Sequence, residues 1–274
     1  MNRLLALLAR LADDLRRGVG ATGATLGYAA AATWATLKAG GRLRATFAQL
    51  DSVFLGGLPL ALLAGAVLGL VVWWQTHDIL LRTVGPGADE FIPRFLSVAV
   101  VLELGPVGAG LLVAARTGAN FGAELAAMRI SEQIDALETL GQSPLRELVG
   151  PRVLACILGL PLLSILIIYT AVFASLLIEQ IQGSMSYTLY LQLCLEYLRL
   201  QDAIPALLKT GVFGWLIGLV GCHYGLSAKE GTVSVGQAAT ASVVVSTLAV
   251  FLAEVVWVGL IQNGLVGLIE SLWL

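Results

Sequence analysis

The stretch VFLGGLPLALLAGAVLGLVVWW, residues 53–74, decides the fold class of this chain. It carries no charged side chain, and it is long enough for the about 20 apolar residues with which a helix crosses the hydrocarbon core of a bilayer. Four more apolar runs follow, and none shows the strict alternation of a membrane β-barrel strand. We therefore predict an all-α polytopic membrane protein with five transmembrane helices, at about residues 53–75, 95–127, 152–180, 203–223 and 238–265.

The composition of the whole chain agrees with that class. Of its 274 residues, 58% are apolar and only 12% are charged, whereas soluble domains average about 25% charged residues. Too few polar side chains remain to cover a soluble fold, which excludes a soluble enzyme, a disordered chain and a nucleic-acid-binding protein. The three cysteines, Cys156, Cys194 and Cys222, have the spacing of neither a disulfide framework nor a metal site.

Residues 1–52 differ from the transmembrane domain that we assign to residues 53–274. Leu4, Leu8, Leu11 and Leu15 fall on one helical face, and most charged side chains fall elsewhere. This pattern predicts an amphipathic helix that lies in the membrane interface on the cytoplasmic side. A soluble helix packed on a partner is the alternative.

The basic residues outside the spans indicate the orientation of the chain. Eleven lie on the side of the N-terminus and three on the opposite side, so the positive-inside rule places the N-terminus in the cytoplasm and, after five spans, the C-terminus outside. The eleven are Arg3, Arg10, Arg16, Arg17, Lys38, Arg42, Arg44, Arg129, Arg146, Arg152 and Lys229, and the three are Arg82, Arg94 and Arg199.

Small residues spaced four apart predict close packing of helices. Such faces include Gly65 and Gly69 in the first span, residues 118 and 122 after the second, and residues 214 and 218 in the fourth. The spacing fits packing within the chain and a seam between two copies equally well.

Two carboxylates lie deep in the predicted spans, where ionisable groups are costly and usually functional. At 1.5 Å per residue, Glu103 lies about 12 Å below the outer surface and Glu254 about 22 Å above the inner one, so both fall at a similar depth on antiparallel helices. We expect them to line one polar cavity that opens outward, with Leu102, Leu68 and Trp74 as further lining residues. Two independent carboxyl groups, each hydrogen-bonded by neighbouring helices, are the alternative.

Other residues of the spans receive more ordinary interpretations. Lys209 is expected to snorkel toward the outer interface. Pro106 is expected to bend the second span just below Glu103. Trp73 and Trp74 are expected to close the first span as interfacial anchors.

The loop between spans two and three, MRISEQIDALETLG at residues 128–141, has helical periodicity. Its apolar stripe predicts a short amphipathic helix at about residues 130–140, which Ser131 would cap and Gly141 with Pro144 would end. Such a helix offers a knob that a soluble cytoplasmic partner can hold. A helix resting on the lipid is the alternative, which its acidic face disfavours next to an anionic leaflet.

Beyond these features, the second and third spans and the loop between them contain a series of short motifs: Glu103-Leu-Gly-Pro-Val107, Ala115-Arg-Thr-Gly118, Ala123-Glu124, Met128-Arg129, Glu132-Gln-Ile-Asp-Ala-Leu137, Ser143-Pro144, Pro151-Arg152 and Leu160-Pro161-Leu162. Together these motifs resemble the MlaE/YrbE family of permeases, the membrane subunits of MCE-type phospholipid ABC transporters. The chain departs from the family pattern at Leu102, where a basic residue is common, and in a long first outer loop at residues 75–93.

The resemblance implies a multi-pass protein of the bacterial inner membrane that works as a homodimer. A phospholipid would occupy a cavity near Glu103, an MCE protein would sit on the outer side, and a STAS-domain protein accompanies some systems. Lipid would move between the inner membrane and the MCE protein, which serves outer-membrane lipid homeostasis. The loop helix would couple to a cytoplasmic ATPase through Arg129, Glu132, Gln133, Asp135 and Glu138.

The residues also bear on catalysis. The chain contains no Gly-Lys pair and hence no Walker A loop, so we expect ATP and Mg²⁺ to be bound by a separate ATPase chain and this subunit to be non-catalytic, without cofactor or metal. A proton-coupled secondary transporter of an amphipathic substrate that uses Glu103 and Glu254 is the alternative. An intramembrane protease is disfavoured, because all seven aspartates lie outside the spans or at their edges and both histidines lie at interfaces.

Overall fold

The computed structural model describes residues 27–38, 42–85, 90–182, 185–196, 200–229 and 231–260. Within these ranges all regular structure is helical, and five helical stretches are long and apolar enough to cross a membrane: Leu43–Thr83, Phe91–Ile130, Leu145–Gln182, Ala203–Leu226 and Thr232–Leu260. The predicted all-α fold with five candidate spans is therefore confirmed. The amphipathic helix expected at Leu4–Leu15 and the end of the fifth span lie outside the described residues.

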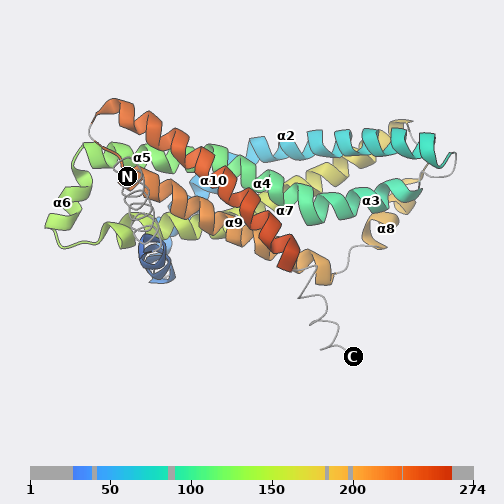
Figure 1. Cartoon of the computed structure of the whole chain (residues 1–274). Coiled ribbons are helices and arrows are strands. Elements are labelled where there is room, and N and C mark those ends of the chain that lie inside the picture. The colour runs from blue at the N-terminus through green and yellow to red at the C-terminus, as the bar shows by residue number, and fades with distance from the viewer. Residues whose placement is uncertain are drawn as a thin grey trace, which may run out of the picture.

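The long helices form one elongated bundle (Figure 1), in which α2 lies along α7 while α10 crosses α5 and α9. Its apolar core draws on several of them through Phe121, Leu160, Phe213 and Val250. The labelled elements are α2 (Leu43–Thr83), α3 (Phe91–Ala99), α4 (Gly105–Val113), α5 (Ala119–Ile130), α6 (Gln133–Thr139), α7 (Gly150–Gln182), α8 (Tyr187–Glu196), α9 (Leu200–Leu226) and α10 (Thr232–Leu260), with π-helical turns η2 (Val100–Leu104), η3 (Ala114–Gly118) and η4 (Leu145–Val149).

The stripes of small residues serve packing within the chain. Gly69 of α2 lies against the backbone of Ala171 on α7, and Gly214 of α9 lies against the backbone of Cys156, also on α7. A Cβ atom at either glycine would collide with the α7 backbone. Gly122 of α5 approaches α10 in the same way. Close backbone approach of this kind is what small residues provide in membrane helices.

The second span is a single helical rod interrupted by π-helical turns. Pro106 lacks an N–H group and sits in the first turn of α4, directly after η2, where the Gly105 N–H donates to the carbonyl of Val100 five residues earlier. A π-helical turn of this kind makes room for the proline ring, which lacks the N–H of a regular helical hydrogen bond and would otherwise clash with the preceding turn. Glu103 therefore lies in η2, at the irregularity that the sequence places beside Pro106.

The connection between the first two candidate spans is shorter than the sequence suggests. Most of the expected long loop at residues 75–93 is helical, because α2 continues to Thr83, where an Asp78–Arg82 ion pair spans one turn, and α3 begins at Phe91. The interfacial role expected for Trp73 is wrong: its side chain is fully buried, and its Nε1 donates to Oε2 of Glu179 on α7 at 2.8 Å. Trp74, the next residue, is 58% exposed.

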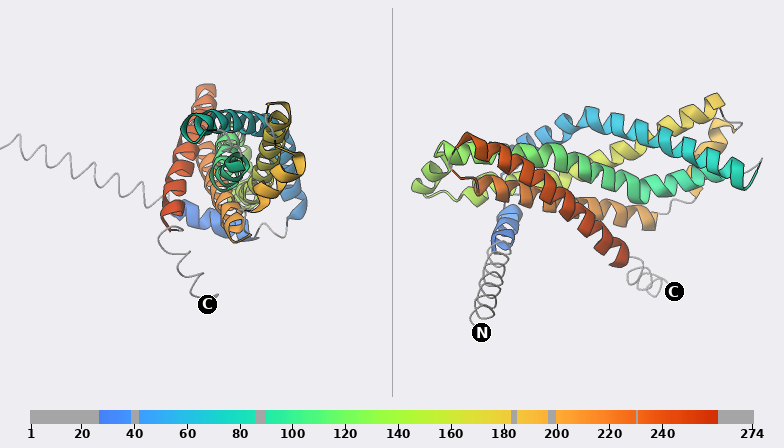
Figure 2. Two further views of the ribbon diagram at one scale, coloured as in Figure 1. Left: turned by 90° about the vertical axis from the view of Figure 1, so that its right-hand side faces the viewer. Right: turned by 45° about the horizontal axis from the view of Figure 1, so that its top comes forward.

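The helix of residues 27–38 stands at a steep angle to the long helices (Figure 2). It packs on α9, where Trp215 Nε1 donates to Thr33 Oγ1 at 3.1 Å and the ring of Tyr28 lies 4.8 Å from that of His223. This segment projects from the half of the bundle that also carries α6, as the right-hand view of Figure 2 shows.

The loop helix is present, although it starts later than expected. Glu132 adopts a left-handed conformation with φ of 58°, which ends α5 and starts α6 at Gln133. Ser131 therefore does not cap α6; its hydroxyl donates to the carbonyl of Ala127 in α5 at 2.8 Å. Gly141, with φ of +71°, closes α6 as the sequence predicts, since its N–H donates to the carbonyl of Glu138.

Candidate functional site

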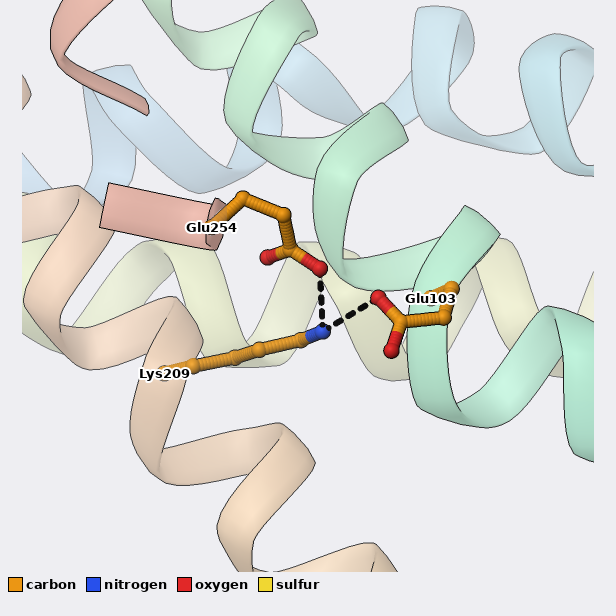
Figure 3. Close-up of polar contacts among 3 residues, drawn as sticks. All are labelled: Glu103, Lys209 and Glu254. Carbon is orange, nitrogen blue, oxygen red and sulfur yellow. Dashed lines mark hydrogen bonds and ion pairs between the residues drawn. The ribbon is translucent and has the colours of Figure 1, made fainter. Parts of the chain in front are cut away.

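Three charged side chains meet between the second, fourth and fifth spans (Figure 3). Lys209 of α9 places its Nζ 2.8 Å from Oε2 of Glu103 in η2 and 2.8 Å from Oε1 of Glu254 on α10. We call this cluster the Glu103–Lys209–Glu254 triad. It brings together the two carboxylates that the sequence placed at similar depth, and it does so through one shared cation.

Packing next to the triad explains why the three helices approach there. Gly110 lies on α4, two turns beyond Glu103, and a Cβ atom there would lie 3.1 Å from Val250 of α10 and 3.2 Å from Phe213 of α9. Both of those side chains are fully buried, and each lies about one turn from its helix's triad member. The absence of a side chain at Gly110 thus lets α9 and α10 close on α4, which fixes the spacing of the charges.

Burial differs among the three side chains. Lys209 is 2% exposed, Glu254 15% and Glu103 49%. Removing an ammonium group from water is costly unless carboxylates compensate it at close range, and two compensate this one. Since Oε2 of Glu254 is buried and has no hydrogen-bond partner among the described residues, the triad retains a free acceptor and one half-exposed carboxylate.

These distances revise two interpretations. The snorkelling expected for Lys209 is wrong, because its side chain is buried and both of its ion pairs point into the bundle. Lys209 lies six residues past Ala203, the first residue of its candidate span, which is about 9 Å along the helix. The alternative of two independent carboxyl groups is also wrong, since Glu103 and Glu254 hold the same ammonium.

The remaining cavity candidates lie near the triad to different degrees. Leu102 precedes Glu103 in η2 and is half-buried. Leu68 of α2 is half-buried and lies over Gly108 of α4, where a Cβ atom would be 3.6 Å from it. Trp74 projects from the exposed face of α2, and the structure does not bring it to the triad.

An apolar pocket of about 610 Å³ adjoins the other side of the same helices. Val101 and Pro106, which flank Glu103, and Leu207, which precedes Lys209 by two residues, form one wall. Side chains of α7 and α8 such as Phe173 and Leu191 form the rest. Pockets of this size and lining suit an apolar ligand, and sequence reasoning missed this one because the helix α8 was not expected.

The residues expected to couple to an ATPase gather around α6. Glu132, Gln133, Asp135 and Glu138 are all exposed, and Arg129 Nη1 holds Asp135 Oδ1 at 2.8 Å, which ties α6 to the end of α5. The two ends of the apolar stripe differ in burial. Ile134 is 2% exposed and anchors α6 on the bundle, whereas Leu140 is 74% exposed and lies on the surface.

A second buried carboxylate escaped the sequence reasoning. Glu179 of α7 is 1% exposed, accepts the indole N–H of Trp73, and lies at the very end of the run, residues 152–180, that is expected to form the third span. His77 stacks on Trp73 with ring centroids 4.8 Å apart. In the described part of the chain, no group of three His, Cys, Asp or Glu side chains is arranged to hold a metal ion.

Comparison with known proteins matches the sequence of this chain to one family. The family model described as Permease MlaE matches residues 46–260. The "Probable ABC transporter permease protein" of Synechocystis is 34% identical over 77% of this chain and 79% of its own length, and one from Rickettsia felis is 35% identical over 74% and 78%. "Protein TRIGALACTOSYLDIACYLGLYCEROL 1, chloroplastic" from Arabidopsis thaliana is 32% identical over 78% of this chain and 60% of its own length.

The family match fits the five candidate spans and has a direct consequence for catalysis. A permease of an ABC transporter is a non-catalytic, multi-pass membrane subunit, and it works with an ATPase subunit. The match covers the triad, the loop helix α6 and all five candidate spans apart from the first three residues of α2. The chain therefore belongs to the MlaE permease family and is the membrane subunit of an ABC transporter.

Proposed function

We propose that this permease moves a phospholipid between its membrane and an MCE protein on the outer side, in the service of outer-membrane lipid homeostasis. The observation that carries the proposal is the triad, a set of charges in the apolar bundle with one half-exposed carboxylate and a free acceptor. A lipid headgroup offers charges and hydrogen-bond donors, and its acyl chains suit the apolar surfaces around the triad. One relative carries a galactosylated diacylglycerol lipid in its name, which supports a lipid substrate in general.

The lipid site would include Glu103, Glu254, Leu102, Leu68 and Trp74, and Lys209 joins them as the cation that holds both carboxylates. Closure of the ATPase would be transmitted through α6 and the ion pair between Arg129 and Asp135 to α5. Because the second span is one rod through η2 and η3, movement of α5 reaches the turn that carries Glu103. ATP drives this cycle, which replaces the proton-coupled alternative for Glu103 and Glu254.

The assembly would contain two copies of this chain, the ATPase, the MCE protein and, in some systems, a STAS-domain protein. A second copy could pack on the outward faces of α10 and α2, where Leu252, Val255 and Leu63 are more than half exposed and would otherwise contact lipid. ATP and Mg²⁺ would bind to the ATPase, and this chain would bind no cofactor. We place it in a bacterial inner membrane, with residues 1–52 as a cytoplasmic and interfacial segment and residues 53–274 as the transmembrane domain.

Site-specific photocrosslinking tests the lipid site within the intact complex. A photoreactive residue replaces Leu102, beside Glu103, and another replaces Phe251, which is 47% exposed on the outer surface of α10. We expect phospholipid adducts at both positions in the resting complex, and loss of those at position 102 alone when the ATPase is trapped with nucleotide. Adducts at position 102 that do not respond to the trapped state would contradict a transport site there.

A further inference from the structure

Three basic side chains surround a small pocket at the predicted cytoplasmic end of the bundle. Lys38 ends the helix of residues 27–38, Arg42 precedes α2, and Arg146 lies in η4; Ala35 completes the lining of a cavity of about 180 Å³. Glu147 pairs with Arg42. Three cations and one anion leave the pocket with two excess positive charges, and they come from three different elements of the fold.

The surroundings of the pocket combine this charge with exposed apolar surface. On the same helix, Trp34 is 61% exposed and Leu37 is 72% exposed, and Lys38 Nζ lies 4.7 Å above the ring of Trp34. The helix itself is fixed on α9 by the hydrogen bond from Trp215 to Thr33. Tryptophan, leucine and lysine in this order are typical of a helix whose apolar face enters the acyl region while its charges stay at the headgroup level.

The volume of the pocket limits what can enter it. Since one water takes about 30 Å³, the cavity holds the equivalent of about six waters, which suits a phosphate group and is too small for acyl chains. Arginine and lysine side chains are the usual partners of phosphate oxygens. The exposed Trp34 and Leu37 beside the pocket supply the apolar contact that a free phosphate ion would not use.

We propose that Lys38, Arg42 and Arg146 form a binding site for the phosphate of an anionic phospholipid in the cytoplasmic leaflet. Basic pockets between membrane helices on this side bind anionic headgroups in other proteins. The site is separate from the triad and from the transported lipid. It anchors the helix of residues 27–38 to the N-terminal end of α2 and to η4, which follows the loop helix α6.

Native mass spectrometry of the full permease complex tests this site without ATP or transport, so its failure leaves the proposed function untouched. The complex is equilibrated with phosphatidylglycerol and phosphatidylcholine in mixed micelles, and the retained lipids are weighed. We expect K38Q and R146Q each to lower retained phosphatidylglycerol relative to phosphatidylcholine about fivefold, and the matched control K229Q, an exposed basic residue on the same side, to leave the ratio unchanged. Arg42 is kept because it pairs with Glu147.

Two outcomes would overturn the proposal. Equal phosphatidylglycerol retention in K38Q, R146Q and K229Q would show that the pocket does not bind the headgroup. Displacement of phosphatidylglycerol by inorganic phosphate, added alone at matched concentration, would assign the pocket to free phosphate instead. Because Lys38 and Arg146 are exposed, both variants are expected to keep the elution profile of the wild-type complex, and either one suffices for the comparison.

Discussion

Replacing Lys209 with methionine removes the cation that holds two carboxylates inside the bundle. Removing one partner of a buried ion pair costs about 3–5 kcal/mol. In this variant the largely buried Glu254 is left without its cation and bears this cost, whereas Glu103 is half-exposed and regains water. We therefore expect the lower end, about 3 kcal/mol, which is about a 100-fold shift in the unfolding equilibrium.

The assay is the free energy of unfolding in bicelles, followed by loss of helical circular dichroism. The matched control is Leu208→Met, because Leu208 is the neighbouring residue of α9 and is 60% exposed. A triple variant, Lys209→Met with Glu103→Gln and Glu254→Gln, removes all three charges and is expected to recover to within about 1 kcal/mol of wild type. The reasoning fails if Lys209→Met costs less than about 0.5 kcal/mol, or if the triple variant is no more stable than the single one.

Three further predictions concern other parts of the fold. Glu132→Arg is expected to weaken co-purification of the ATPase while helix content is unchanged; undiminished co-purification would remove α6 from the interface. Gly69→Leu is expected to cost about 3 kcal/mol of stability, because the new side chain collides with the α7 backbone. The control Gly236→Ala, at a position with nothing within 4 Å, is expected to stay within about 1 kcal/mol of wild type. Equal effects of the two substitutions would refute the close approach of α2 and α7. Trp73→Phe is expected to cost about 1–3 kcal/mol of stability, because the carboxylate of Glu179 loses its hydrogen-bond donor. The double variant Trp73→Phe with Glu179→Leu should restore much of that stability. A double variant that is less stable than Trp73→Phe would argue against the pair.

The five spans could be predicted from the sequence because hydrocarbon admits few polar side chains, so that apolar length alone identifies a spanning helix. The similar depth of Glu103 and Glu254 followed from helical rise. The depth of a residue does not determine the rotation of its helix about the helix axis, and so it does not predict which neighbours the side chain faces. The sequence predicts an interfacial position for Lys209, because nothing in its own apolar run indicates that it faces two carboxylates on other helices.

The same limit explains Trp73 and the small-residue faces. Trp73 and Trp74 are adjacent and chemically identical, yet one is fully buried against Glu179 and the other is exposed, because successive residues differ by about 100° around a helix. Gly69 and Gly214 showed that backbones approach, without showing which helix each one meets. The helix α8 and the pocket beside it depend on contacts between separate helices, such as the hydrogen bond from Tyr190 to Ser175. The local sequence pattern does not predict such contacts.

ATP-dependent transfer of labelled phospholipid tests the central proposal most directly. The complete complex is reconstituted in vesicles with a labelled phospholipid, and label appearing on the MCE protein is followed with ATP, without ATP, and with a proton gradient alone. The account predicts transfer that requires ATP, ignores the gradient and is lost in Glu103→Leu while ATP hydrolysis continues. Transfer that Glu103→Leu leaves unchanged, or ATP hydrolysis with no lipid moved in wild type, would contradict it.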